Sequence, residues 1–339
     1  MSPERPPAPA LPTGSRNFWP AAALLALLAL TAALAPSRFL FFEGGRLRGS
    51  LNEILLQGSS VMLLSVGMTL VIATAGIDLS VGSVMALAGA VAALLVTRTG
   101  LPLAAVIAGG LAVAACAGLW NGLLVAFLRL QPIVATLILL VAGRGAAQLL
   151  TDGQIINFQR PAFQFLAVGA VLGLPFPLFI VGFVAGATFL VTRKTVAGLY
   201  IESVGNNERA SRLAGLRPGR VKLLVYGFSG FCAGVAGLFE TAYISAADIN
   251  KCGQYIELDA ILAVVIGGTS FSGGRANLLG SLLGALVMRA LTTNIQMMNV
   301  PSAYNLVVKA LTVVAVCLLG SERFRALFAR RRWRRRQRA

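Results

Sequence analysis

The chain has 339 residues, of which 57% are hydrophobic and only 12% are charged. Soluble domains carry about 25% charged residues, so the composition excludes a soluble globular protein and predicts a single polytopic helical membrane domain of the all-α class. The net charge of +17 does not indicate nucleic-acid binding, because nine of the 29 basic residues lie in the tail 321–339 and seven lie in a central loop, 192–222, where they fix membrane topology.

Apolar runs predict about ten membrane-spanning helices. Residues 1–17 are rich in Pro and Ala and are expected to form a disordered cytoplasmic N-terminus. The run 18–35 ends in a sequence that resembles a signal-peptidase site, but Pro36 follows it directly, so we expect an uncleaved first helix. The further runs cover 54–75, 78–96, 102–128, 132–150, 175–191, 223–245, 258–266, 278–291 and 303–319.

The run 258–266 is too short for a regular spanning helix, so we expect it to be broken or partly re-entrant. Arg129, Arg275, the central loop and the basic tail then lie on one side of the membrane, while charges in the three longest loops of the other side balance. The positive-inside rule therefore predicts a transmembrane domain over 18–320 with both termini in the cytoplasm.

The central loop 192–222 is the one long polar segment between apolar runs, and it predicts contact with a cytoplasmic partner. Its inner part has the periodicity of a short amphipathic helix, since Ala210, Leu213 and Ala214 share a face. A loop that only fixes topology is the alternative.

No set of catalytic residues is present, so we do not expect an enzyme. The chain has no histidine, which removes the commonest general base and metal ligand. No lysine follows a phosphate-binding GxxxxGK[ST] loop, and the cysteines have no metal-ligand spacing. We expect no cofactor in this chain, and any ATP that drives it must be hydrolysed by another subunit.

Polar side chains at membrane depth are expensive, and they are therefore candidates for a translocation path. These residues are Asp78, Asn121, Arg144, Glu240, Asp259, Asn294 and Lys309.

Each candidate also has a structural interpretation. Asp78 and Asp259 each head an apolar run, where an aspartate can cap the following helix. Arg144 either pairs with an acid inside the bundle or extends toward the membrane surface. Asn121 either bonds a hydroxylated solute or forms a helix–helix hydrogen bond.

Two pairs of segments suggest an internal repeat. GIDLSVGSVMALAGA and IELDAILAVVIGG each place an Asp before a Gly-ended apolar run, and GLWNGLLVAFL and GSLLGALVMRAL share spaced glycines. Gly-interrupted segments at corresponding places in two halves are typical of transport paths.

Several motifs resemble those of the ribose/xylose/arabinose-type permeases of bacterial ABC sugar importers. They are GMTLVIATAGIDLSVGSVMALAG, VATLILLVAGRGAAQLLTDGQ, AGLYIESVGNNERASRLAGL and ELDAILAVVIGGTSFSGGRANLLGSLLGALV, in this order from about residue 54 to 319. Within the family, GLWNGLLVAFLRLQPIVATLILLVAGRG is most similar to galactofuranose importer permeases. One departure is TAGIDLS, where the ribose type often has TGGIDLS.

The resemblance implies an inner-membrane permease that works with a separate cytoplasmic ABC ATPase, a second permease chain (a paralogue or a copy of itself) and a periplasmic sugar-binding protein. The ATP and magnesium would be bound by the ATPase. The outer segments 152–165 and 248–257 would meet the binding protein. The central loop would dock on the ATPase through Glu202, Gly205, Asn206, Asn207, Ala210 and Gly215.

Two other functions remain open on the sequence. One is an ABC permease for a different solute, such as branched-chain amino acids. The other is an ion-coupled secondary carrier that works alone, and the scarcity of acids that could relay protons disfavours a proton-coupled form of it.

Overall fold

The computed structural model describes residues 17–298, 304, 307–311 and 314. Seven helices in this part are long and apolar enough to cross a membrane. They are α4 (Ser50–Ala73), α5 (Val81–Arg98), α6 (Leu103–Ala126), α7 (Pro132–Leu150), α9 (Phe176–Lys194), α12 (Pro218–Ile244) and α14 (Leu278–Met297). An eighth apolar helix, α2 (Phe18–Leu34), has 17 residues. The chain is therefore a polytopic helical membrane protein.

These helices match the predicted runs 18–35, 54–75, 78–96, 102–128, 132–150, 175–191, 223–245 and 278–291 closely. The run 258–266 corresponds to α13 (Ile256–Ile266), whose 11 residues rise about 17 Å and fall short of a hydrocarbon core of about 30 Å. The predicted last span, 303–319, lies largely outside the described residues, as do 1–16 and the tail 321–339.

The connecting segments hold more structure than the hydropathy predicted. Short strands pair antiparallel as β1 (Phe41–Glu43) with β2 (Arg46–Arg48), β3 (Ile156–Asn157) with β6 (Ala246–Ala247), and β4 (Ala170–Val171) with β5 (Leu174–Pro175). Short helices α3 (Pro36–Phe39), α8 (Pro161–Val168), α10 (Val196–Asn206) and α11 (Glu208–Leu213) complete the described part. The all-α prediction therefore holds for the bundle but not for its connections.

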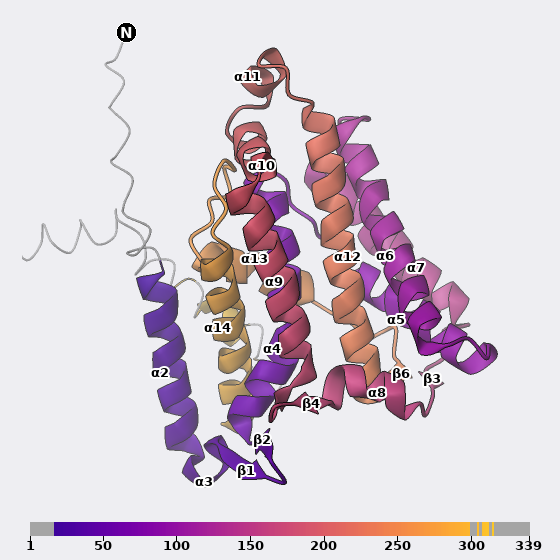
Figure 1. Cartoon of the computed structure of the whole chain (residues 1–339), viewed down its shortest axis with the longest axis vertical. Helices are drawn as coiled ribbons and strands as arrows, with labels where there is room; N and C mark the ends of the chain where they lie inside the picture. Colours follow the sequence, from indigo (N-terminus) through magenta and orange to yellow (C-terminus); the bar gives the residue numbers. More distant parts are fainter. Residues whose placement is uncertain (1–16, 299–303, 305–306, 312–313, 315–339) are drawn as a thin grey trace, which may run out of the picture.

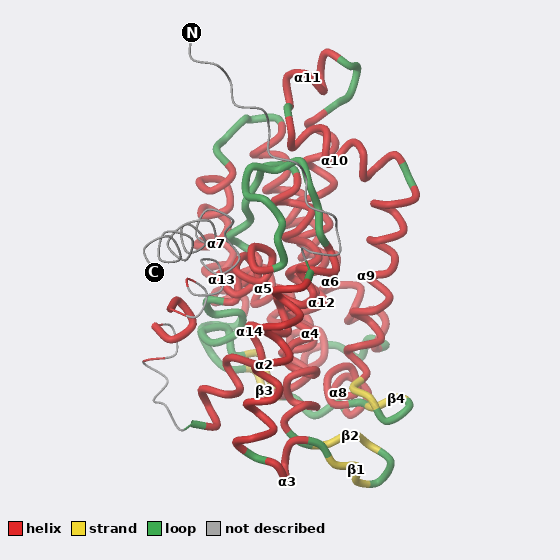
Figure 2. The backbone as a smooth tube through the Cα atoms, turned by 90° about the vertical axis from the view of Figure 1, so that its left-hand side faces the viewer, coloured by secondary structure: helices red, strands yellow, loops and turns green. Residues whose placement is uncertain are grey.

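The connections gather at the two ends of the bundle (Figures 1 and 2). At one end lie α10, α11, the α6–α7 connection 127–131 and the turn 267–277; we call this end the loop face. At the opposite end lie α8 and the strands, which we call the strand face.

Helix α4 lies at the centre. In its most apolar stretch of 18 residues, 78% of the residues are buried, against 22% in the corresponding stretch of α6. Around it, α6 and α12 pack tightly because glycines face each other: an added Cβ at Gly118 would lie 2.9 Å from the Cα of Gly230. Small residues permit this close approach of two membrane helices. Helix α9, by contrast, packs on α4, α8 and α10 and runs along one margin of the molecule (Figure 2).

Candidate functional site

The loop face presents a small helical platform built from α10 and α11. Helix α11 begins where Asn207 accepts a hydrogen bond on Oδ1 from the backbone N–H of Ala210 at 3.0 Å. It ends before Gly215, which adopts a left-handed φ of +86° that suits glycine. The predicted amphipathic helix is confirmed. Its apolar residues, however, point to solvent, and the side chain of Leu213 is 91% exposed.

Ion pairs attach the platform to the bundle. Glu208 accepts from Lys222 of α12 at 2.6 Å and from Arg212 of α11 at 3.2 Å. The hydrogen bond from Lys222 is the main reason that the pKa of Glu208 lies below its ordinary value of 4.5. One carboxylate thus couples α11 to the first turns of α12.

A close backbone contact joins α10 to the centre of the protein. A Cβ added at Gly205 would lie 1.8 Å from the carbonyl oxygen of Ala73, the last residue of α4. The same carbonyl accepts from the N–H of Gly274 at 2.9 Å, so the turn 267–277 shares this junction. Glu202 adds an acceptor for the N–H of Ala276 at 3.4 Å.

The six residues predicted to dock on an ATPase therefore have different surroundings. Asn206, Asn207, Ala210 and Gly215 are exposed, whereas Gly205 is buried and Glu202 is half-buried. The exposed four are accessible to a partner. The other two hold α10 against α4 and the turn 267–277.

A basic hollow lies beside the platform. It has a volume of about 900 Å³ and runs between α11 and the segment that joins α6 to α7. Its basic lining residues are Arg129, Arg209, Arg212 and Lys222. Together with the exposed face of α11, this hollow can accept an acidic, partly apolar protein surface.

Asp78 lies inside the bundle, in the non-helical linker between α4 and α5. Its Oδ1 accepts from the N–H and the hydroxyl of Ser80 at 3.0 and 2.7 Å, and its Oδ2 accepts from Ser229 of α12 at 2.9 Å. Asn121 of α6 donates to the Ser80 hydroxyl at 2.8 Å. Ser80, not Asp78, occupies the N-cap position of α5.

Asp78 and Asn121 therefore act as a joint of three helices. Both side chains are buried, at 1% and 0% exposure. For Asn121 the structure favours the hydrogen bond between protein elements over a bond to solute, although its Oδ1 has no partner among the described residues. The linker that carries Asp78 starts directly after Ala73, so this joint adjoins the contact at Gly205.

The other predicted path residues lie elsewhere. Arg144 donates to the carbonyl oxygens of Ile249 and Cys252 at 2.6 and 2.9 Å, which is neither the acid pair nor the surface position we expected. Asn294 of α14 accepts from Thr31 of α2 at 2.9 Å. The structure does not bring these residues to one place.

Asp259 lies in the first turn of α13 and pairs with Lys309 at 2.7 Å. Tyr255 occupies the N-cap position of that helix, so the predicted capping role of Asp259 is wrong.

A polar cavity that the sequence did not predict lies near the strand face. It has a volume of about 330 Å³ and is enclosed by α4, α12, α13, α14 and the segment before α13. Two of its lining acids, Glu240 and Asp259, were candidates from the sequence. Its other polar lining residues are Gln57, Ser60, Tyr243, Lys251, Gln254, Arg289 and Thr292.

Arg289 is the most informative of these residues. Its Nε is buried and has no hydrogen-bond partner among the residues that the structure describes. Across the same cavity, Gln57 donates to the hydroxyl of Tyr243 at 3.4 Å. An unpaired guanidinium edge beside amide and hydroxyl groups suits a polyhydroxylated ligand. A lone arginine within an apolar run is the sequence signal that could have identified this cavity.

The strand face brings together two distant segments, 152–165 and 248–257. Strand β3 pairs antiparallel with β6, and Gln148 of α7 donates to Asn250 at 3.1 Å. Gln164 of α8 donates to Ser245 at 2.9 Å. The two outer segments that the resemblance assigns to a binding protein thus form one continuous surface.

Comparisons with known proteins identify related transport proteins. Residues 50–317 match the family model described as "Branched-chain amino acid transport system / permease component". The galactofuranose transporter permease protein YtfT of Escherichia coli strain K12 is 47% identical over 322 residues, which cover 93% of this chain and 94% of that protein.

Two further relatives cover most of the chain. The fructose import permease protein FruF of Bifidobacterium longum strain NCC 2705 is 41% identical over 84% of this chain and 81% of that protein. The ribose import permease protein RbsC of Escherichia coli strain K12 is 39% identical over 89% of this chain and 92% of that protein.

Proposed function

The chain belongs to the family of transport-system permease components, and from this premise we propose that it is the membrane-spanning subunit of a bacterial ABC importer for a monosaccharide. The observation that carries the mechanism is the path of contacts from the loop face inward. The exposed platform α10–α11 meets the end of α4 at Gly205, and the Asp78 joint follows directly in the chain.

The partners follow from this proposal. A cytoplasmic ABC ATPase binds ATP and magnesium and docks on the platform and the basic hollow, which offer an exposed Leu213 and several unburied basic groups. A periplasmic sugar-binding protein docks on the strand face. A second permease chain, a paralogue or a copy of this one, completes the pore, and no nucleic acid takes part.

In the proposed mechanism, the platform transmits movement of the ATPase to the membrane helices. When the ATPase closes on its nucleotide, it moves α11 and α10 together. The backbones of α10 and α4 are in direct contact at Gly205. The movement therefore passes to the linker that holds Asp78 and changes the tilt of the helices around this linker. Because the access change is a rigid-body step, the chain needs no catalytic residue of its own.

The proposal includes ten crossings in the inner membrane with both termini in the cytoplasm. Eight described apolar helices, α13 and the predicted span 303–319 make up the ten. The internal repeat is also part of the proposal. It is supported by the sequence, where Asp78 precedes α5 and Asp259 lies in the first turn of α13.

The transported sugar is proposed to be galactofuranose or a ribose-like sugar, because those sugars appear in the names of the relatives. The polar cavity is proposed as a contact site for its hydroxyl groups, and its charged members are Glu240, Lys251, Asp259 and Arg289. The family description also names branched-chain amino acids. The cavity favours the sugar, because hydroxyl, amide and charged groups lie beside apolar side chains in its lining and can bond the hydroxyl groups of a sugar.

Transport by the reconstituted complex tests the proposal. We expect Leu213→Asp to abolish sugar uptake and the ATP hydrolysis that the loaded binding protein stimulates, without lowering the unfolding temperature, because this side chain is 91% exposed. Leu213→Met is the matched control, since it keeps an apolar side chain of similar size at the same exposed position. We expect Arg289→Met to lower uptake while the ATPase stays bound.

Three outcomes would contradict parts of the proposal. Normal coupling in Leu213→Asp removes the platform from the mechanism. Uptake by this chain alone, driven by an ion gradient without ATPase, indicates a secondary carrier. Competition by leucine or isoleucine but not by sugars indicates an amino-acid permease.

A further inference from the structure

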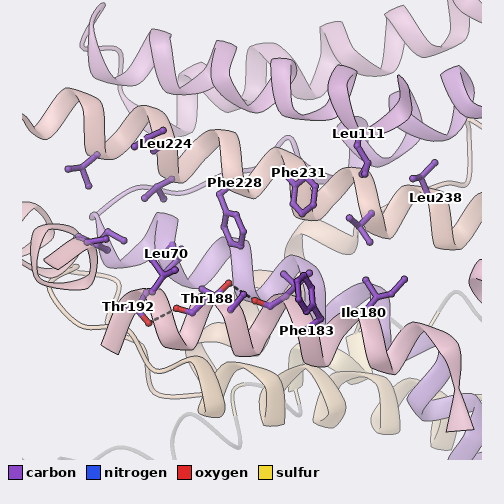
Figure 3. A pocket seen from close by; sticks show the side chains of 18 of the residues that line it. Leu70, Leu111, Ile180, Phe183, Thr188, Thr192, Leu224, Phe228, Phe231 and Leu238 are labelled. Carbon is purple, nitrogen blue, oxygen red and sulfur yellow. Dashed lines mark hydrogen bonds between the residues drawn. The ribbon is translucent and has the colours of Figure 1, made fainter. Parts of the chain in front are cut away.

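A second, apolar groove opens on the side of the bundle between α9 and α12, with α4 at its base (Figure 3). It has a volume of about 650 Å³. Leu70 of α4, Phe183 of α9, and Leu224 and Phe228 of α12 line it, and Figure 3 shows these side chains directed into the space between the helices. The groove is separate from the polar cavity and from the loop-face hollow.

The hydroxyl groups along α9 already have hydrogen-bond acceptors within the helix, so an occupant of the groove need not supply any. Thr188 donates to the carbonyl oxygen of Val184 at 2.7 Å, and Thr192 donates to the carbonyl oxygen of Thr188 at 2.8 Å. Both bonds lie within the helix, as the dashed lines in Figure 3 show. The surface offered to an occupant is therefore hydrocarbon, at the depth of the membrane interior.

The lining residues argue against a protein helix as the occupant. Membrane helices pack through small residues that let their backbones approach, as Gly118 and Gly230 do between α6 and α12. The groove is lined instead mostly by leucine, isoleucine, valine and phenylalanine. Bulky side chains around a narrow space fit a flexible hydrocarbon chain.

Basic residues flank the groove in the chain at its loop-face end. Arg193 follows the lining residue Thr192, and Lys194 then ends α9. Arg220 precedes the lining residue Val221 of α12. All three basic side chains are exposed, and the ion pairs of the described loop face use Arg212 and Lys222 instead. Arg193 donates to the carbonyl oxygen of Ala276 at 3.4 Å, which leaves Lys194 and Arg220 available to an anion at the membrane surface.

The length of the groove matches a lipid. From Val221 to Phe231, ten residues further along α12, the helix rises about 15 Å, which is half of a hydrocarbon core of about 30 Å. One leaflet thus spans the stretch from the basic residues to the middle of the groove.

We propose that the loop-face half of this groove is a binding site for an anionic phospholipid. One acyl chain lies between α9 and α12, and the headgroup phosphate meets Lys194 and Arg220. The site fills the gap that α9 leaves beside α12.

Native mass spectrometry of the full-length chain tests this site, with phosphatidylglycerol and phosphatidylethanolamine supplied in nanodiscs. We expect phosphatidylglycerol to remain bound after release, and the double variant Lys194→Gln, Arg220→Gln to retain at least tenfold less of it. Ala187→Trp, which places an indole in the groove, should remove the bound lipid altogether.

Matched controls separate the groove from general membrane contact. Ala26→Trp changes an exposed alanine of α2, and Arg98→Gln removes an exposed basic side chain at the end of α5, away from the groove. Both should retain phosphatidylglycerol as the wild type does. The proposal is overturned if the groove variants also retain it, or if the variant Ala187→Cys cross-links to a helix of a second permease chain.

Discussion

At the scale of single residues, Gly205 carries a strict requirement in the loop face. Exposed residues of the platform such as Arg209 and Leu213 have steric freedom to vary, but Gly205 leaves no room for a β-carbon against the backbone of α4. The backbone of Ala73 cannot retreat, because its carbonyl also holds the turn 267–277 through Gly274. Position 205 therefore requires glycine, the residue without a side chain.

Gly205→Ala is therefore expected to lower stability by about 1–3 kcal/mol, the usual cost of overpacking, and to reduce coupled ATP hydrolysis. Thermal unfolding in detergent and sugar-stimulated hydrolysis measure the two effects. Gly145→Ala in α7 is the control, since an added Cβ there meets nothing within 4 Å and alanine favours the helix. Equal behaviour of the two variants would refute the close contact.

The sequence identified some site residues and missed others for a physical reason. Asp78 and Asn121 were found because polar groups at membrane depth need partners, and they proved to share Ser80. Their partners could not be predicted, because hydrogen bonds across 41 and 151 positions depend on helix placement. Arg144 illustrates the same limit, since its acceptors are backbone carbonyls that leave no signature in the sequence.

At the scale of elements, the predictions succeeded where periodicity or length carries the signal. The amphipathic pattern predicted α11, and the length of the run 258–266 predicted that α13 falls short of the membrane thickness. Helix α10 and the paired strands were missed. Strands of two or three residues have no periodicity to detect, and the pairing of β3 with β6 joins segments 89 positions apart at Asn157 and Ala246.

The attachment of α11 to α12 predicts a pH dependence. Because the pKa of Glu208 is lowered in the folded protein, its ionisation stabilises the fold at neutral pH. The contribution is present above the ordinary value of 4.5 and is lost as the pH falls through the lower folded pKa. We expect the difference in unfolding temperature between wild type and Glu208→Gln to shrink between about pH 5 and pH 3.

The effect will be small, since the Glu208 side chain is 41% exposed and solvent screens the pair. Lys222→Met should abolish most of the same pH dependence, whereas Arg209→Gln, which changes an exposed arginine of α11, should preserve it. A constant difference across this pH range would show that Lys222 does not hold the carboxylate.

At the scale of the whole molecule, hydropathy predicted which segments form spanning helices but not which of these helices contact each other. Apolar length is a local property, so the ends of most helices fell within a few residues of the prediction. Which helices touch depends on small residues that face each other in space. The seam of α6 and α12 and the separation of α9 from α12 were therefore visible only in the structure.

This unequal packing predicts which distances change during transport. Helix α12 should move with α6, while α9 moves relative to both. We expect spin labels at Leu190 of α9 and Leu224 of α12 to change their separation by several ångströms between nucleotide-free and vanadate-trapped complexes, as measured by pulsed electron paramagnetic resonance. Both positions are exposed, at 57% and 68%.

Labels at Trp120 of α6 and Leu224 provide the internal control, because Trp120 is 54% exposed and lies on the partner helix of the tight seam. Their separation should stay constant through the cycle. A change across the seam equal to that across the groove would show that the bundle does not divide in this way.

The groove beside α9 has a consequence for how the cell adjusts this protein. Part of the wall of the helical domain is supplied by the surrounding bilayer, a material that is renewed without any change in the gene. When fatty-acid length or unsaturation shifts with growth temperature, the fit around α9 shifts as well, while the seam between Gly118 and Gly230 keeps its spacing. Two cultures with identical permease sequences would then import at different rates.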